Sequence, residues 1–163
     1  MSARGRAAWA VAVVPVLALA AACGNGEPAA APSSPEVADE LELTAGSTIV
    51  GLPKSLGPNP ADATAGAART SDDTLIYVVT FGSSSCPMVA EPTAQLAGDG
   101  AVEVAFPELG VGACTSDFVP STTVVALPDE VDPEADLTVT IGVLGEIVLP
   151  AGSDDAVWAT AAA

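Results

Sequence analysis

The chain has no histidine, and its other scarce residue types exclude several classes of function before any motif is considered. Histidine is the commonest general base and the commonest metal ligand in proteins, so Ser-His-Asp and Cys-His catalysis are excluded. Aromatic residues make up only 4% of the chain. A glycosidase that uses two carboxylates would lack rings to stack on a sugar, which disfavours that activity.

Basic residues are also scarce, since the chain has four lysines and arginines against 21 acidic residues. Two of the four, Arg4 and Arg6, precede the apolar stretch at the N-terminus, which leaves Lys54 and Arg69 in the rest of the chain. Such an acidic surface repels phosphate backbones and anionic lipid headgroups. We therefore expect no nucleic-acid partner and no electrostatic contact with a membrane.

The first 22 residues have the three parts of a bacterial signal peptide. Arg4 and Arg6 form the basic start, residues 7–19 are an apolar run, and residues 20–22 are alanines. The apolar run is too short to favour a permanent transmembrane helix. The pattern predicts that residues 1–22 are a signal peptide, removed on export.

The signal peptide is followed by a cysteine in the sequence Leu17-Ala-Leu-Ala-Ala-Ala-Cys23-Gly24. This segment resembles the lipobox of bacterial lipoproteins, with Ala20 where the family most often has leucine. The resemblance implies that Cys23 becomes the mature N-terminus and carries a diacylglycerol anchor, with acyl chains such as palmitate. It places the protein on the extracytoplasmic face of the cell membrane. Residues 23–40 are rich in Pro, Ala, Ser and Gly, and this composition predicts a flexible tether.

Residues 41–150 are predicted to form one small all-β domain. Runs rich in β-branched and apolar residues, bounded by Gly and Pro, predict strands within residues 41–52, 74–81, 88–96, 101–106, 121–127, 137–141 and 146–149. Short strands at this spacing favour an antiparallel β-sandwich, Ig-like or similar, with a small β-barrel as the alternative. Residues 53–73 are expected to be a surface connection with a short helix near residues 61–68. Residues 151–163 are expected to be a C-terminal tail.

Three short segments resemble small uncharacterised lipoproteins of high-GC Gram-positive bacteria. They are Gly-Ser-Ser-Ser-Cys-Pro at residues 82–87, Cys-Thr-Ser-Asp at residues 114–117, and Pro-Ser-Thr-Thr-Val-Val-Ala-Leu-Pro at residues 120–128. The resemblance implies an envelope location and a β-rich domain, and it carries no activity.

With Cys23 assigned to the lipid anchor, Cys86 and Cys114 are the remaining pair of thiols. Each follows a predicted strand, and an oxidising compartment outside the membrane would preserve a bond between them. The alternative is a thiol or redox protein that uses these two cysteines. Redox proteins usually place their cysteines two residues apart beside a group that lowers the thiol pKa, so a structural disulfide is favoured.

Three further groups of residues have side chains that could carry chemistry. Lys54 beside Ser55 could form a serine–lysine dyad, but a solvated loop lysine is strongly favoured. Residues 83–85 are serines that could satisfy backbone groups in a loop. The acidic segment 129–136 offers oxygen ligands of the kind that calcium prefers, without the spacing of an EF-hand. Its candidate ligands are Asp129, Asp132, Glu134 and Asp136.

Three functions from different classes follow. The first, and the one favoured, is a membrane-anchored envelope lipoprotein whose β-domain binds an envelope protein or cell-wall partner, or is structural, without catalysis. The second is an extracytoplasmic thiol or redox protein. The third is a module that binds calcium weakly or holds a small ligand.

Overall fold

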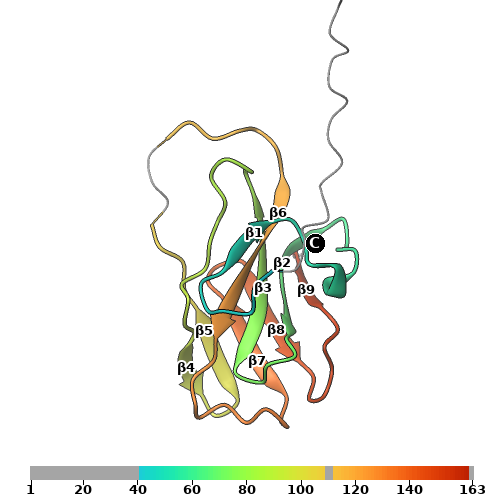
Figure 1. Ribbon diagram of the computed structural model, residues 1–163, viewed down its shortest axis with the longest axis vertical. Coiled ribbons are helices and arrows are strands. Elements are labelled where there is room, and N and C mark those ends of the chain that lie inside the picture. The colour runs from blue at the N-terminus through green and yellow to red at the C-terminus, as the bar shows by residue number, and fades with distance from the viewer. Residues whose placement is uncertain (1–40, 109–111, 162–163) are drawn as a thin grey trace, which may run out of the picture. The chain divides into compact units, whose positions relative to one another are not determined.

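Two β-sheets make up the part of the chain that the computed structural model describes, residues 41–108 and 112–161. One sheet has five strands in the order β1-β6-β3-β2-β9, and the other has four in the order β4-β5-β7-β8 (Figure 1). The strands are β1 (Thr48–Val50), β2 (Ala63–Arg69), β3 (Leu75–Gly82), β4 (Gln95–Gly98), β5 (Ala101–Val104), β6 (Val119–Ala126), β7 (Leu137–Ile141), β8 (Gly145–Leu149) and β9 (Val157–Thr160). The predicted all-β sandwich is confirmed, and the barrel alternative is wrong, because neither sheet closes on itself within these residues.

The described residues contain no helix long and apolar enough to cross a membrane. The predicted signal peptide, Cys23 and the tether up to residue 40 lie outside the described residues.

The centre of the five-stranded sheet is the pair β3 and β6. They run antiparallel in unbroken register from Leu75 opposite Ala126 to Gly82 opposite Val119. The β-branched and aromatic residues of β3 suit a pleated strand, and seven of its eight residues are buried. Both faces of this sheet are therefore covered, which is why β3 reads as a continuous apolar run.

The core between the sheets is built from alternating residues. In β7, Leu137, Val139 and Ile141 are fully buried, while the two intervening threonines are half-buried. This confirms the alternation predicted for the strand. β7 also pairs in parallel with β5, so the four-stranded sheet is mixed rather than wholly antiparallel.

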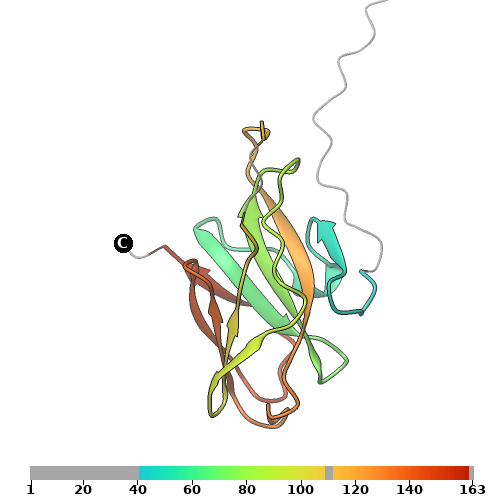
Figure 2. The ribbon, with the colours of Figure 1, turned by 90° about the vertical axis from the view of Figure 1, so that its left-hand side faces the viewer.

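A second apolar cluster covers the outer face of the five-stranded sheet. The segment from Leu41 to Leu56 lies over this face, and it contributes β1 and the 3-10 turn η1 (Lys54–Leu56). Figure 2 shows the segment, in cyan, on the side of the sandwich away from β4 and β5. The strand predicted over residues 41–52 thus shrinks to β1, because the remaining residues serve as a cover.

The chain crosses from the first sheet to the second at residues 92–94. Ala126 at the end of β6 donates to the Pro92 carbonyl and accepts from the Ala94 backbone N–H, each over 2.9 Å. β4 then starts at Gln95 in the other sheet. The strand predicted over residues 88–96 is therefore wrong in its bounds, since only its last two residues belong to β4.

The short helix predicted near residues 61–68 is wrong, because a turn at residues 61–62 leads into β2, which begins at Ala63. Its small residues gave no β signal, yet β2 lies inside the sheet between β3 and β9. The indole of Trp158 lies directly opposite Gly66 and explains why position 66 is glycine. A Cβ atom built on Gly66 would overlap Trp158 Cε3 and lie 2.7 Å from Cζ3, so only glycine leaves room for the ring.

The sheet also continues beyond residue 150, where the domain was expected to end. β9 pairs antiparallel with β2, with Ala159 opposite Ala65 and Val157 opposite Ala67. Ala159 is buried in the core between the sheets. Residues 157–160 are therefore part of the domain and not a tail.

Candidate functional site

A disulfide joins the loop that follows β3 to the loop that precedes β6. Cys86 and Cys114 are bonded, and their Cα atoms lie 5.6 Å apart. These loops extend beyond the strands at the top of Figure 1. We call residues 83–86 and 112–118 the disulfide end. The predicted disulfide is confirmed, and it encloses the crossing segment together with β4 and β5.

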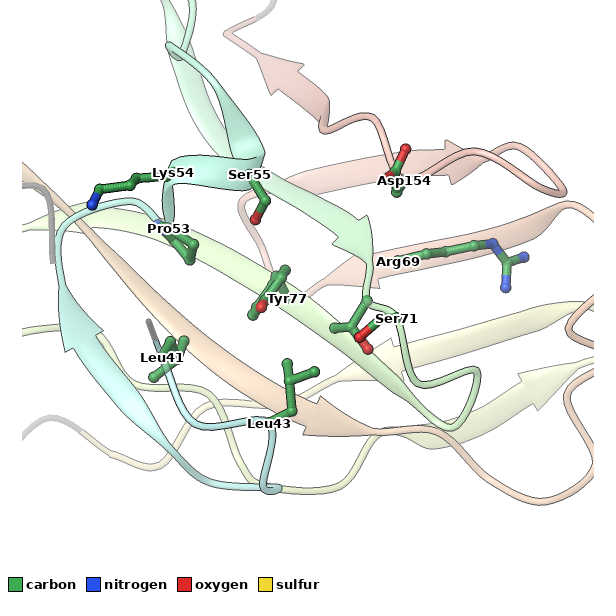
Figure 3. Close-up of a pocket in the computed structure, with 10 residues that line it drawn as sticks. Leu41, Leu43, Pro53, Lys54, Ser55, Arg69, Ser71, Tyr77 and Asp154 are labelled. Carbon is green, nitrogen blue, oxygen red and sulfur yellow. The ribbon is translucent and has the colours of Figure 1, made fainter. Parts of the chain in front are cut away.

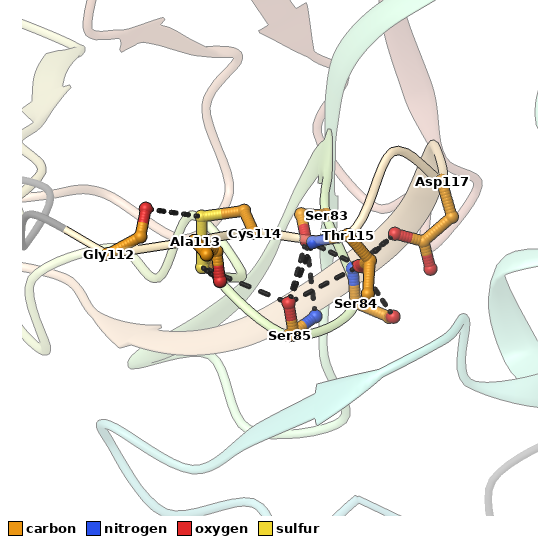
Figure 4. The surroundings of a disulfide bond; sticks show 9 residues. Ser83, Ser84, Ser85, Gly112, Ala113, Cys114, Thr115 and Asp117 are labelled. Carbon is orange, nitrogen blue, oxygen red and sulfur yellow. Dashed lines mark hydrogen bonds between the residues drawn. A yellow bond between two sulfur atoms is a disulfide. The ribbon is translucent and has the colours of Figure 1, made fainter.

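Hydroxyl groups link the same two loops beside the disulfide (Figure 4). The Thr115 hydroxyl donates to Asp117 Oδ1, so it must accept from the Ser83 hydroxyl, 2.7 Å away. The Thr115 backbone N–H donates to Ser85 Oγ over 3.0 Å, and the Ser84 backbone N–H donates to Asp117 Oδ1 over 3.1 Å. The serines at 83–85 therefore bind the opposite loop as well as satisfying backbone groups.

Asp117 is the acceptor at the centre of this network. Hydrogen bonds from Ser84 and Thr115 favour its ionised form and lower the pKa of the carboxyl to about 2. The side chain is exposed, so the shift comes from these donors and not from a neighbouring cation. An ionised Asp117 is thus part of the folded geometry of the disulfide end.

We expect Thr115→Ala to raise the pKa of Asp117 from about 2 toward the ordinary value of 3.8, because one of its two main donors is lost. Carboxyl carbon shifts followed by NMR between pH 1.5 and 6 measure this directly. The lowered pKa means that Asp117 stabilises the fold above pH 4, and that this contribution disappears as the pH falls from about 4 to about 2.

Asp72 provides the matched control, because hydrogen bonds from Thr74 lower its pKa in a different loop. Thr74→Ala should raise the pKa of Asp72 and leave that of Asp117 in place. If Thr115→Ala leaves the Asp117 titration unchanged, the network shown in Figure 4 does not persist in solution.

Phe118 is the exposed aromatic residue of the disulfide end, with 71% of its surface accessible. Its ring stacks on Phe81 at a centroid distance of 5.6 Å, and Phe81 in turn meets Trp158 at 6.2 Å. The inner two rings belong to the cluster on the outer face of the five-stranded sheet. Phe118 is therefore held by a row of rings while one of its faces remains open to solvent.

The surroundings of the disulfide offer little to a redox reaction. Within the described residues, the polar groups nearest the two sulfur atoms are the Ser85 hydroxyl, which can donate to Cys86 Sγ over 3.9 Å, and the carbonyl oxygens of Gly112 and Ala113, at 3.9 and 4.0 Å. The bonded sulfur atoms have no proton to donate to these carbonyls. No cation or helix N-terminus is among these polar groups to stabilise a thiolate. The redox alternative gains no support from this geometry.

The acidic segment 129–136 does not gather its carboxylates around one point. Asp132 accepts from the Glu134 backbone N–H, and Asp136 accepts from the Ala151 backbone N–H, each over 2.9 Å. These side chains, with Asp129, stay apart: across residues 41–108 and 112–161, no three His, Cys, Asp or Glu side chains are grouped as metal ligands. Calcium binding stays a prediction without a geometric basis.

Lys54 and Ser55 are neighbours in η1, but their side chains point in different directions (Figure 3). No hydrogen bond joins them, so a serine–lysine dyad is not formed in this structure. Both residues line a groove of about 940 Å³ on the outer face of the five-stranded sheet.

Sequence reasoning missed Asp117, Phe118 and the groove as site features. The Cys-Thr-Ser-Asp segment at residues 114–117 resembles a lipoprotein segment, but its hydrogen-bond partners lie about 30 residues earlier in the chain, where no local pattern connects the two. No protein-family model, curated protein or solved structure matches this chain.

Proposed function

We propose that this protein is an envelope lipoprotein, anchored to the outer face of the cell membrane through Cys23, whose β-sandwich binds a partner without catalysing a reaction. The binding surface is the disulfide end. The observation that carries the proposal is Phe118, a large aromatic side chain that stays 71% exposed at a cross-linked end of the domain.

The disulfide end has the properties of a preorganised binding surface. The disulfide and the hydrogen bonds centred on Thr115 hold its two loops together, which reduces the conformational entropy lost on binding. Aromatic residues are enriched among those that dominate binding energy. Stacking on Phe81 fixes the orientation of the Phe118 ring before a partner arrives.

Photo-crosslinking in cells that process lipoproteins tests binding at the disulfide end. A benzoylphenylalanine in place of Phe118 should give a discrete adduct, because this position contacts the partner. The same probe in place of Val143, which is fully exposed at the turn between β7 and β8, is the matched control and should give none. Digestion of the adduct with a protease or a muramidase separates a protein partner from a cell-wall partner.

Cys23→Ala in the same strain tests the anchor. The unchanged protein should sediment with membranes, and the variant should be released. Equal membrane association of both forms would contradict lipid anchoring at Cys23, while equal crosslinking from positions 118 and 143 would contradict binding at the disulfide end.

A further inference from the structure

We infer that the groove on the outer face of the five-stranded sheet binds a small amphiphilic organic anion, with its acidic group at Lys54 and its apolar body over Tyr77 and Leu43. This site lies away from the disulfide end and depends on neither Cys23 nor Phe118. It is therefore a second surface, with a ligand of different chemistry from the partner proposed above.

The groove is formed where residues 41–56, here called the N-terminal cover, meet the outer face of the five-stranded sheet (Figure 3). Tyr77 of β3 lies at its floor, Leu41 and Leu43 come from the cover, and Ser55 points toward Tyr77 from η1. Its volume of about 940 Å³ lies at the upper end of the range of about 300 to 1,000 Å³ that is usual for small-molecule sites. The groove is thus large enough for an organic ligand and lined by apolar and hydroxyl-bearing groups.

Charge identifies the class of ligand. Lys54 and Arg69 are the only two basic residues after Arg6 in a chain with 21 carboxylates, and both line this groove. One carboxylate, that of Asp154, lines it with them. Among the lining residues cations thus outnumber carboxylates by two to one, on a protein whose formal net charge is -17. Other carboxylates adjoin lining residues in the chain, among them those of Glu42, Asp72 and Asp155. An anion is therefore repelled less here than elsewhere on the surface, and contact with a cation has to supply the attraction.

Neither cation has its charge neutralised within the described part of the chain. Arg69 donates to two backbone carbonyls, from Nη2 to Ala135 over 2.6 Å and from Nε to Pro150 over 3.3 Å, and forms no ion pair. Lys54 has no hydrogen bond or ion pair to any residue in 41–108 or 112–161. The guanidinium is thus held by these carbonyls, and Figure 3 shows it turned away from Tyr77. The Lys54 side chain also extends away from Tyr77 in Figure 3, so its ammonium lies at the rim of the groove, and it has to turn inward to contact an acidic group of a ligand there.

Two matched fluorescent probes test the inference. Anilinonaphthalene sulfonate joins apolar rings to a sulfonate, and N-phenylnaphthylamine has the same rings without the charge. We expect both to bind the unchanged protein, and Lys54→Gln to weaken binding of the sulfonate about fivefold while leaving the neutral probe unaffected. Added salt should weaken binding of the sulfonate in the same selective way.

Three further variants locate the site and separate it from the disulfide end. Lys54→Gln combined with Gln95→Lys restores the net charge on an exposed strand of the other sheet, and it should remain as weak as Lys54→Gln alone. Ser55→Trp fills the groove from an exposed position and should abolish binding of both probes. Phe118→Ala should leave both affinities unchanged.

The inference is overturned if the sulfonate does not bind the unchanged protein, or if Ser55→Trp leaves its binding intact. It is also overturned if Lys54→Gln weakens both probes equally, because the acidic group would then have no part in recognition. Loss of probe binding in Phe118→Ala would instead assign the probes to the disulfide end and remove the case for the groove.

Discussion

Replacing both Cys86 and Cys114 by serine is expected to lower the free energy of unfolding by about 3 to 4 kcal/mol, from the entropy of closing a loop of this length in the unfolded chain. The bond spans 28 residues, and these include β4 and β5, half of the four-stranded sheet. Urea unfolding at constant pH measures the change.

Reductant supplies the control for this expectation. Reduction of the unchanged protein should bring its unfolding curve onto that of the double-serine variant, and the variant should not respond to reductant. A loss below about 1 kcal/mol would mean that the two loops stay together in the unfolded or reduced chain without the bond, contrary to the loop-entropy argument.

Gly66→Ala is expected to destabilise the fold by about 1 to 3 kcal/mol, because the new methyl group would overlap the indole of Trp158. Alanine is ordinarily the better residue in a strand, by about 0.5 to 1 kcal/mol. The same substitution made in a Trp158→Ala background should therefore change sign and stabilise. A double-mutant cycle measures the change in the free energy of unfolding caused by Gly66→Ala in each background, by chemical unfolding.

Gly98→Ala is the matched control for that cycle. Gly98 also lies in a strand, but a Cβ atom added there meets nothing within 4 Å. It should be neutral or slightly stabilising whether Trp158 is present or not. If Gly66→Ala costs the same with and without Trp158, the cross-strand contact does not explain why β2 has glycine at this position.

This contact also shows where sequence reasoning about the fold stops. β3 and β7 were predictable because β-branched residues and alternation describe a strand in local terms. β2 was not, because it consists mainly of alanine and glycine, which have little strand preference of their own. β9 has strand-favouring Val, Trp and Thr, but it is only four residues long and does not alternate between apolar and polar residues. The glycine of β2 is explained by Trp158, which lies opposite Gly66 in the sheet but more than 90 residues later in the chain.

The candidate sites divide in the same way. The disulfide was predictable, because the chain has three cysteines and only Cys86 and Cys114 remain once Cys23 is assigned to the lipid anchor. The Thr115–Asp117 network was not, because neither residue is distinctive until a loop with serines is placed beside it. The groove was equally hidden. Lys54 and Arg69 are two ordinary surface cations in the sequence, and only the cover over the sheet brings them to one surface.

The N-terminal cover has a mechanical consequence. Any tension on the chain ahead of residue 41 first reaches the buried Leu41 and then β1, an edge strand held to β6 by three residue pairs. β3 and β6, in contrast, are joined over eight pairs. We therefore expect residues 41–56 to detach from the sheet at a lower force than the one that separates β3 from β6. The groove would then be lost, while the disulfide end would stay folded.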